Sequence, residues 1–389
     1  MIALLLLLAM LPAAAPEVSA RGLVELTTDG EVLFLPQHKR QPFEGWLYTH
    51  SQDSCAVIAD AMVDVTHYPR LFPNVKSVTL ISRVGATVTY EMELTVILSP
   101  TIHGSITRVG PRTLRYNDPD TKAYSVYDLS DDDDGTCAVR YQVVEEAGKS
   151  VGWVDIIKSL ESTAGDAGNF AVAISSARGF SKPEARQQRV RTHHADEALA
   201  LLAGKGTAIS IDRRDPKPTY TLRRRVKTPF SEVAWAIRNK KGYAEKMPSM
   251  KKAVDRGKSV AYTIGGFGGR VSFETAVSEE VDGSGVLTIH ETVNGGDLSA
   301  KDGSWRWRVV PVSGGVDVEL VFKADFVAGS RLLSAMAETD PVTRESFMLY
   351  VALSLMSDVV GGKSLPATAP TLAGSAVGPA IPVIAATVQ

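Results

Sequence analysis

Apolar and polar residues alternate along several stretches of the chain, and this alternation predicts β-strands with one buried face. The clearest stretch begins at Val88. Its apolar positions lie on one face and are Val88, Tyr90, Met92, Leu94 and Val96, whereas Glu91 and Glu93 lie on the other face. Similar alternation predicts strands at 43–49, 102–109, 113–117, 123–129 and 137–145. Such strands are typical of an antiparallel sheet that is hydrated on one side.

Two stretches of the same region have helical periodicity instead. A short helix is predicted from Cys55 to Val65 by apolar residues three and four positions apart, and Pro69 and Pro73 end it. A long helix is predicted over 151–180, with Leu160 in its apolar stripe.

The same order of patterns returns later in the chain. Tyr68 precedes Pro73 by five residues and Tyr243 precedes Pro248 by five residues, so the offset is 175. Strands are predicted at 220–226, 260–264, 271–277, 285–291, 305–310 and 316–326, and a helix at 231–238. A last, long helix is predicted to begin at Asp340-Pro341 and to carry Met348, Val351 and Leu355 in its stripe. A repeat of this length indicates two copies of one domain.

Each copy is predicted to contain a strand, a short helix, five or six antiparallel strands and one long helix, which is an α+β fold. We place the first copy at 43–182 and the second at 219–362. Residues 21–42 are expected to be a polar lead-in, 183–218 a linker with a short helix at 197–202, and 363–389 a disordered tail rich in Ala and Pro. If each sheet curls around its C-terminal helix, an apolar pocket remains between them.

Charge and the N-terminal residues narrow the function classes. The 389 residues carry a formal net charge of −2, which provides no overall field that favours nucleic acid. Residues 1–20 contain an apolar block from Leu4 to Leu8 and end in Val18-Ser19-Ala20, the pattern of a cleaved signal peptide. We therefore expect an exported protein, periplasmic or secreted. The basic run Arg223-Arg224-Arg225 is interpreted as a solvated strand end rather than as a lipid contact.

The two cysteines leave two states open. Cys55 and Cys137 can pair only if their Cα atoms lie within about 7 Å, and we expect two small core residues rather than a disulfide. The second copy has Phe230 and Val316 at the matching places. No CxxC motif or Cys/His cluster occurs, so no zinc site is expected, and no cofactor is assigned.

These residues resemble a known superfamily. Tyr68-Pro69 followed by Phe72-Pro73, the alternating strand and the C-terminal helix are similar to START-like proteins, and the first copy looks closest to the coenzyme-Q-binding, polyketide-cyclase-like members. The second copy has Ala244 in place of the first Pro and a GGFGG segment from Gly265, which we interpret as a flexible hairpin. The resemblance covers most of residues 43–362. It implies two helix-grip domains, each a curved antiparallel sheet wrapped around a long C-terminal helix, that hold lipids, quinones, sterols or polyketides.

The apolar faces and this resemblance together predict a function. We expect a binding or carrier protein for a hydrophobic small molecule (a lipid, quinone or sterol), with transient contact to a membrane surface and no nucleic-acid partner. The expected lining residues of the first copy are Val88, Tyr90, Met92, Leu94, His103 and Leu160. Those of the second copy are Tyr262, Phe322, Met348, Val351 and Leu355. The alternative is that these side chains simply fill a solid core.

A cyclase-like or hydrolase-like enzyme in the same cavity is the alternative function. It requires polar groups that converge inside, for which His103 with Tyr90 or Arg115 is the candidate set. The segment 148–152 matches G-x-S-x-G, but no βαβ pattern surrounds it, so we interpret it as a turn and assign no catalytic residue. A third hypothesis is an interaction module that clasps a protein partner with its edge strands.

Overall fold

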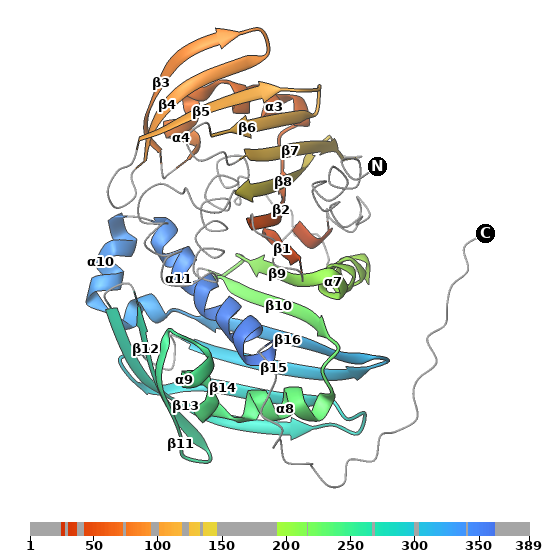
Figure 1. The fold of residues 1–389 in the computed structure, drawn as a ribbon, viewed down its shortest axis with the longest axis vertical. Helices are drawn as coiled ribbons and strands as arrows, with labels where there is room; N and C mark the ends of the chain where they lie inside the picture. Colours follow the sequence, from red (N-terminus) through yellow and green to blue (C-terminus); the bar gives the residue numbers. More distant parts are fainter. Residues whose placement is uncertain are drawn as a thin grey trace, which may run out of the picture.

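The computed structural model describes residues 25–27, 30–36, 43–72, 75–94, 101–118, 124–132, 135–145, 193–215, 217–266, 269–298, 303–339 and 341–361. Its strands form one sixteen-stranded sheet in which the described pairs are antiparallel. The first structural half lies at the top of Figure 1 and the second at the bottom. The predicted antiparallel α+β architecture is therefore confirmed.

The first half follows the predicted order of elements. It contains β2 (Phe43–Ser51), α3 (Cys55–Val63), η1 (Val65–His67), α4 (Tyr68–Leu71), β3 (Val75–Val84), β4 (Thr87–Leu94), β5 (Thr101–Arg108), β6 (Thr113–Asn117), β7 (Tyr124–Asp131) and β8 (Cys137–Glu145). Strand β3 was not predicted, because most of its residues are exposed and apolar and polar positions do not alternate along it. It forms one edge of the sheet.

The second half repeats this order. It contains β10 (Thr219–Val226), α8 (Phe230–Arg238), η3 (Lys240–Gly242), α9 (Tyr243–Lys246), β11 (Met250–Asp255), β12 (Ser259–Gly266), β13 (Gly269–Val281), β14 (Leu287–Gly296), β15 (Gly303–Val312), β16 (Gly315–Ala324), η4 (Phe326–Gly329), α10 (Arg331–Thr339), α11 (Pro341–Ser354) and the π-helix η5 (Leu355–Val360). The GGFGG segment lies at the β12–β13 hairpin, where Gly266 pairs with Gly269, as predicted.

The repeat extends to single hydrogen bonds. The Tyr68 hydroxyl donates to the Met62 carbonyl at 2.6 Å, and the Tyr243 hydroxyl donates to the Ile237 carbonyl at 2.7 Å. In both halves a helix ends five residues before the tyrosine, a 3₁₀ turn follows, and the tyrosine begins a short second helix. Each tyrosine therefore holds the same break between two helices, and the two halves are structural copies.

Two further strands join the halves into one sheet. Strand β1 (Val32–Pro36) pairs with β2 of the first half, β9 (Gly206–Asp212) pairs with β10 of the second, and β1 and β9 pair with each other. We call β1 and β9 the seam. The helix α7 (His193–Lys205) precedes β9. The expected polar lead-in and linker are therefore wrong at β1 and β9, because both segments contribute strands to the sheet. The short helix predicted at 197–202 lies within α7.

The seam is apolar on both faces, which explains why alternation did not reveal it. Leu33 and Ile209 belong to the core of the second half, whereas Val32, Phe34 and Ala208 pack under α7. Two glycines permit the close approach of β1 and β9. A Cβ atom on Gly206 would lie 2.0 Å from the Leu35 carbonyl oxygen, and one on Gly30 would lie 1.6 Å from that of Ile211. Buried strands of this kind appear as continuous apolar runs in a sequence.

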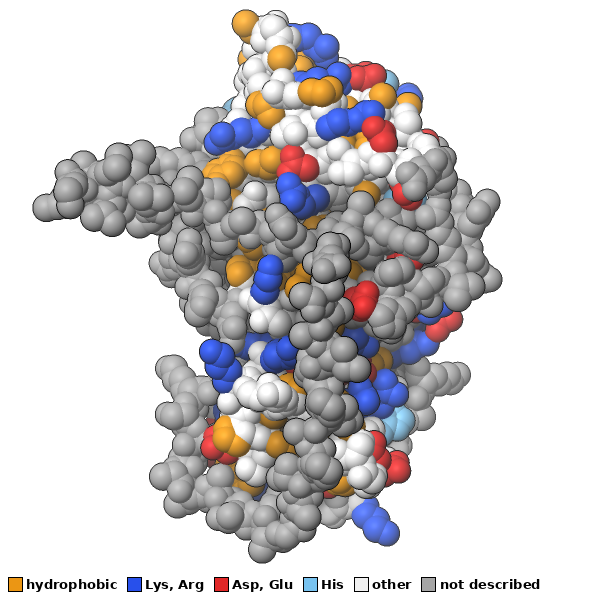
Figure 2. Space-filling view, turned by 90° about the vertical axis from the view of Figure 1, so that its right-hand side faces the viewer, with side chains coloured by type: hydrophobic (Ala, Val, Ile, Leu, Met, Phe, Trp, Pro, Cys, Tyr) orange, Lys and Arg blue, Asp and Glu red, His pale blue; other side chains and the backbone are white. Residues whose placement is uncertain are grey.

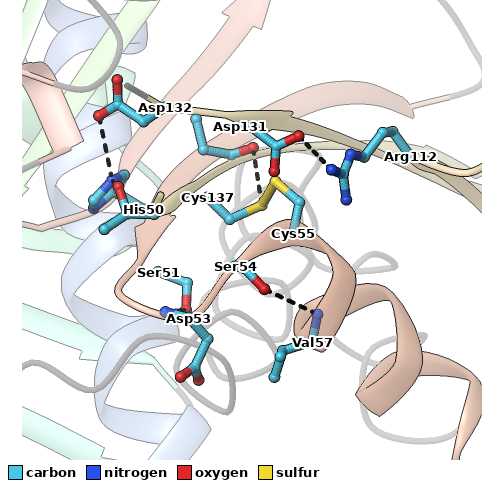
Figure 3. The surroundings of a disulfide bond; sticks show 12 residues. His50, Ser51, Asp53, Ser54, Cys55, Val57, Arg112, Asp131, Asp132 and Cys137 are labelled. Atoms are coloured by element: carbon cyan, nitrogen blue, oxygen red, sulfur yellow. Dashed lines mark hydrogen bonds and ion pairs between the residues drawn. A yellow bond between two sulfur atoms is a disulfide. The ribbon is translucent and has the colours of Figure 1, made fainter. Parts of the chain in front are cut away.

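The cysteines form a disulfide between α3 and β8 of the first half (Figure 3). Their Cα atoms lie 4.9 Å apart, and both residues are fully buried. The expectation of two free core cysteines is therefore wrong. The missing information was that α3 begins directly over the start of β8, which brings residues 82 positions apart into contact.

Several sequence predictions lie outside the described residues. These are the signal peptide at 1–20, the long helix at 151–180 with Leu160, the G-x-S-x-G segment, Asp340 and the tail at 363–389. Pro341 does begin a helix, as predicted. Among the residues that the structure describes, no helix is both long and apolar enough to cross a membrane.

Candidate functional site

The inner face of the sheet, which carries α3 in the first half and α8 in the second, contains the apolar positions predicted from alternation. In the first half α3, η1 and α4 cover one part of this face. Val88, Tyr90 and Ile106 are buried there. The ring of Tyr68 meets the ring of Tyr90 edge-on, with centroids 5.6 Å apart. This part of the inner face is a packed core.

A second part of the same face is only partly covered. Its half-buried apolar side chains run across neighbouring strands from β3 to β8, and we call them the first-half band: Val78, Met92, Ile102, Tyr116, Tyr127 and Tyr141. Strand pairing sets Val78 beside Met92, Met92 beside Ile102, and Tyr127 beside Tyr141. Because directly paired residues share a face of a sheet, Val78, Met92 and Ile102 form one apolar row and Tyr127 and Tyr141 form another. Tyr116 on β6, which pairs with Ile106, lies on the same face.

The aromatic end of the band carries hydroxyl groups. The rings of Tyr127 and Tyr141 stack with centroids 4.3 Å apart. The Tyr141 and Ser125 hydroxyl oxygens lie 3.0 Å apart, within hydrogen-bond distance. Burial, together with the neighbouring Tyr141, raises the pKa of Tyr127 well above its usual value, so this hydroxyl stays neutral near pH 7. The band therefore combines apolar contact area with neutral hydroxyl groups.

In the second half the corresponding face is closed by the chain itself. Met348 and Val351 of α11 and Leu355 of η5 belong to the same hydrophobic cluster as Tyr262 and Phe322, and all five are less than 5% exposed. The rings of Trp305, Phe273 and Phe326 fill the space around Phe322. These five residues, which were predicted to line a cavity, instead pack against one another in a core.

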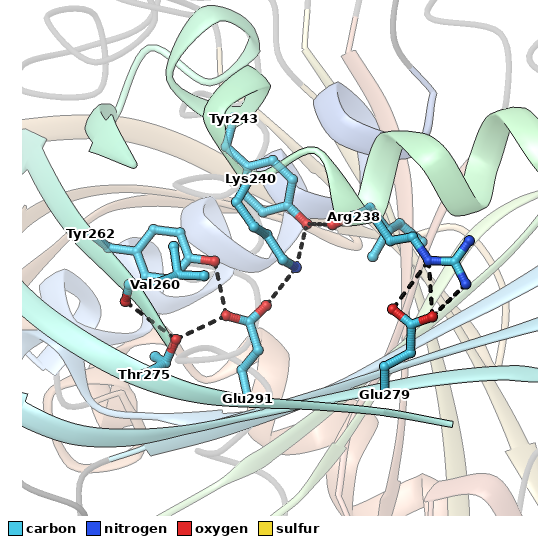
Figure 4. Close-up of polar contacts among 9 residues, drawn as sticks. Arg238, Lys240, Tyr243, Val260, Tyr262, Thr275, Glu279 and Glu291 are labelled. Atoms are coloured by element: carbon cyan, nitrogen blue, oxygen red, sulfur yellow. Dashed lines mark hydrogen bonds and ion pairs between the residues drawn. The ribbon is translucent and has the colours of Figure 1, made fainter. Parts of the chain in front are cut away.

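A buried polar network lies within this closed core (Figure 4). The Lys240 ammonium donates to Glu291 Oε1 at 2.7 Å and to the Tyr243 hydroxyl at 3.1 Å. The other Glu291 oxygen accepts from the Tyr262 hydroxyl at 2.8 Å and from Thr275 Oγ1 at 3.1 Å. Lys240 is 4% exposed and Glu291 is fully buried. Sequence analysis missed this network, because a lone Lys and a lone Glu 51 residues apart give no local signal.

The network shifts the acidity of its members in a consistent direction. Burial by itself lowers the pKa of Lys240, but the Glu291 carboxylate and the Tyr243 hydroxyl more than offset this, so the net shift is upward. Burial raises the pKa of Tyr243 to about 12, and burial with the nearby Glu291 raises that of Tyr262 well above its usual value. Near pH 7 the lysine is therefore charged and the tyrosines are neutral.

Among its described residues, the first half has no equivalent of this network. The offset of 175 places Val65 where the second half has Lys240, and strand pairing with Tyr90 and Tyr262 places Ile106 where it has Thr275. The neighbouring strand β6 presents buried Leu114 and half-buried Tyr116. The same architecture is thus built with apolar side chains in one half and with a buried ion pair in the other.

His103 does not lie where the sequence analysis expected it. Its Nε2 atom is 3.2 Å from Glu91 Oε2 and its side chain is 48% exposed, which puts it on the outer face of the sheet. Ile102 and Gly104 take the inner positions on β5, because Ile102 pairs with Met92 and Gly104 with Tyr90. Arg115 donates to Asn117 and is also exposed. The expectation that His103 lines the cavity is wrong, and the proposed set with Tyr90 and Arg115 does not converge.

A hollow of about 560 Å³ lies on the second half and was not predicted. Strands β13 to β16 line it with largely polar side chains: Ser278, Glu279, Glu280, Thr288, His290, Ser304, Trp305, Arg306, Val321 and Lys323. His290 and Arg306 are paired across β14 and β15 and point away from the buried Ile289 and Trp307. The described residues contain no group of three His, Cys, Asp or Glu side chains that could hold a metal ion.

Two arginines of the basic run form ion pairs. Arg223 Nε lies 2.7 Å from Glu319 Oε2, and two guanidinium nitrogens of Arg225 contact Asp317, at 2.5 and 2.8 Å. Arg224, between them, is half-buried. These acidic residues lie on β16, which is paired with β10. The interpretation of this run as a strand end rather than a lipid contact agrees with these pairs.

No family model matches the sequence, and no curated protein matches it. Solved structures do match. The STAR-related lipid transfer protein from Xanthomonas axonopodis is 14% identical, with 38% of this chain and 92% of that chain covered and a TM-score of 0.27. The di-domain ARO/CYC BexL from the BE-7585A biosynthetic pathway is 12% identical, with 83% and 99% covered and a TM-score of 0.28. A START superfamily protein from Mycobacterium smegmatis is 10% identical, with 35% and 95% covered and a TM-score of 0.28. The solved structures that match include START-related proteins, the superfamily that the sequence resemblance named.

Proposed function

We propose that the protein binds a hydrophobic small molecule, a lipid, quinone or sterol, on the first-half band. The observation that carries this proposal is the contrast between the two inner faces. In the second half α11 and η5 bury the expected lining residues, whereas in the first half the band stays half-buried. A ligand that covered the band would gain about 25 cal/mol for each Å² of apolar surface removed from water.

The aromatic end of the band supplies the polar contacts of the proposed site. The neutral hydroxyls of Tyr127 and Tyr141 would hydrogen-bond a carbonyl or hydroxyl group of the ligand. A largely apolar pocket with a few polar groups is typical of small-molecule sites.

A charge placed in the band tests the proposal. Ile102→Lys is expected to weaken binding of ubiquinone, cholesterol or phosphatidylcholine at least about tenfold, because an ammonium group loses its hydration when an apolar ligand covers it. The matched control is His103→Lys, the next residue on the same strand but on the outer face, which should bind as the wild type does. Binding is measured on the full chain by native mass spectrometry, and the thermal midpoint of each variant is recorded.

Two results would contradict this proposal. One is a gently purified wild-type protein that carries no co-purified lipid or quinone and binds none of the three compounds. The other is an Ile102→Lys protein that remains folded and binds with unchanged affinity.

We also propose that the protein is exported, as its first twenty residues predict. The Cys55–Cys137 disulfide supports this, because disulfides form and persist in oxidising compartments. Protein recovered from the periplasm or the medium of an expressing cell should begin after Ala20 and contain no free thiol. Retention of the full N-terminus, with the protein confined to the cytosol, would refute export.

A further inference from the structure

One end of the first half exposes large apolar side chains on three separate segments. Val84 lies at the β3–β4 turn and is 74% exposed, Val109 follows β5 and is 59% exposed, and Val57 on α3 is 53% exposed. Ile81 on β3 is 56% exposed. We call these four residues the valine tip. Single exposed apolar residues are ordinary on protein surfaces, so their grouping has to be established.

Hydrogen bonds hold these segments together. The Arg108 amide donates to the Ala86 carbonyl at 3.1 Å, which joins the two turns that carry Val84 and Val109. The Arg108 guanidinium contacts Asp60 Oδ1 at 2.6 Å, and Asp60 is one helical turn after Val57. At the upper end of Figure 2, hydrophobic side chains alternate with Lys and Arg side chains. These contacts hold the three segments together at one end of the first half.

The corresponding end of the second half carries charged residues at the matching positions. The turn glycines Gly85 and Gly257 both have positive φ, so the two turns correspond. Arg256 and Lys258 flank the second glycine where Val84 and Ala86 flank the first. The helical offset of 175 places Glu232 at the position of Val57. Three charged side chains of one half are thus replaced by apolar ones in the other, and the fold itself requires neither set.

The geometry favours a lipid surface over a protein strand as the partner. Strand β3 is an edge strand, but its pairing with β4 is irregular at Val75/Ser77 and at Leu80/Ser82. Such bulges hinder the addition of another strand. Val84 and Val109 also lie at turns and are exposed, so a protein partner would need a matching apolar hollow. The hollow on the second half of this chain is lined mainly by polar side chains and does not offer one to a second copy.

Cations lie beside the apolar residues. Arg83 directly precedes Val84, Arg108 directly precedes Val109, and Arg112 follows three residues later. Arg108 and Arg112 pair with Asp60 and Asp131, and Arg83 donates to the Val63 carbonyl. Apolar side chains with adjoining arginines are typical of surfaces that dip into the interface between lipid headgroups and acyl chains. We propose that the valine tip docks the protein on a phospholipid bilayer.

This docking surface is separate from the ligand site. Val84 ends β3, whereas Val78 of the first-half band lies near its beginning, six residues away, and Ile81 lies between the two positions. A strand rises about 3.3 Å per residue, so the two positions are about 20 Å apart. The proposal therefore stands without the proposed ligand and can fail or succeed independently of it.

The proposal is tested by substituting tip residues with those found at the matching positions of the second half. The double variant Val57→Glu and Val84→Arg places at the tip what the second half carries at the same positions, so it should fold normally. The control is Val281→Arg, which removes an equally exposed valine from the second half. Full-length proteins are sedimented with vesicles of phosphatidylcholine alone and of phosphatidylcholine with phosphatidylserine.

The wild type and Val281→Arg are expected to sediment with vesicles, and more strongly with those that contain phosphatidylserine. The double variant should bind at least about tenfold more weakly to both, since two apolar contacts are replaced by charges. The proposal is overturned if the wild type binds neither vesicle or if the folded double variant binds equally well. It is also overturned if light scattering shows a wild-type dimer that the double variant abolishes, which would assign the tip to a second copy of the chain.

Discussion

At the scale of single residues, the repeat allows each half to serve as a reference for the other. Lys240 and Glu291 form a buried ion pair at a place where the first half uses apolar side chains. Removing two charges from water costs several kcal/mol for each ion, and their attraction recovers this only with full hydrogen bonding. Since the first half folds with Val65 in place of Lys240, the pair is a feature of the second half and not a requirement of the architecture.

Replacing one member of this pair should therefore destabilise the protein more than replacing both members with apolar residues. Lys240→Val is expected to destabilise the second half by about 3–5 kcal/mol, because it leaves Glu291 buried without its counter-charge. Adding Glu291→Leu should recover most of that loss. Arg238→Ala, which breaks the partly exposed pair with Glu279, is the control and should cost about 1 kcal/mol or less. Urea unfolding of all four proteins provides the comparison, and a double variant no more stable than Lys240→Val would contradict this account.

The alternation of residues along β5 also determines the position of His103. Alternation on β5 sets Ile102, Gly104 and Ile106 on one face, so His103 between them had to lie on the other. The outer position of His103 could have been predicted from the strand alone. The Lys240–Glu291 pair could not, because it depends on how β14 passes beneath η3, a long-range arrangement without a local sequence signal.

At the scale of elements, the sequence predicted those segments whose two faces differ. Strands β4, β6 and β8 were placed within a residue or two of their bounds, because each is buried on one side. The missed strands lack that asymmetry. Strand β3 is exposed on nearly all of its residues, and β1 and β9 are buried on both faces. Hydrophobic alternation reports the difference between two faces, so it does not detect a strand whose faces are alike.

The disulfide joins helix α3 to strand β8, and its loss is expected to destabilise the first half alone. It closes a loop of 82 residues, from the start of α3 to the start of β8, and its loss should destabilise the first half by about 4 kcal/mol. The double variant Cys55→Ser and Cys137→Ser tests this. The second half should keep its stability, because its core is a hydrophobic cluster separate from that of α3 and β8. The measurement is amide hydrogen exchange on both halves of the double variant. An equal loss of protection in both halves would contradict this prediction.

At the scale of the whole molecule, the described residues form three hydrophobic clusters on one sheet. The seam contributes Leu33 and Ile209 to the core of the second half, and α7 covers its opposite side. An ionic cluster strengthens this attachment. Arg213, after β9, lies 2.6 Å from Glu31 before β1 and 3.1 Å from Glu345 of α11, and Glu345 also accepts from the Tyr220 hydroxyl at 2.6 Å. The seam is thus bound more closely to the second half than to the first.

The pairing of β1 with β9 also determines where the chain enters and leaves the first half. Pro36 and Gly206 lie opposite each other on adjacent strands. Everything between them is consequently an insertion whose two ends meet, and the remainder could be closed by a short hairpin. A chain built in this way could accept a different domain at this place while the second half keeps its own strand order.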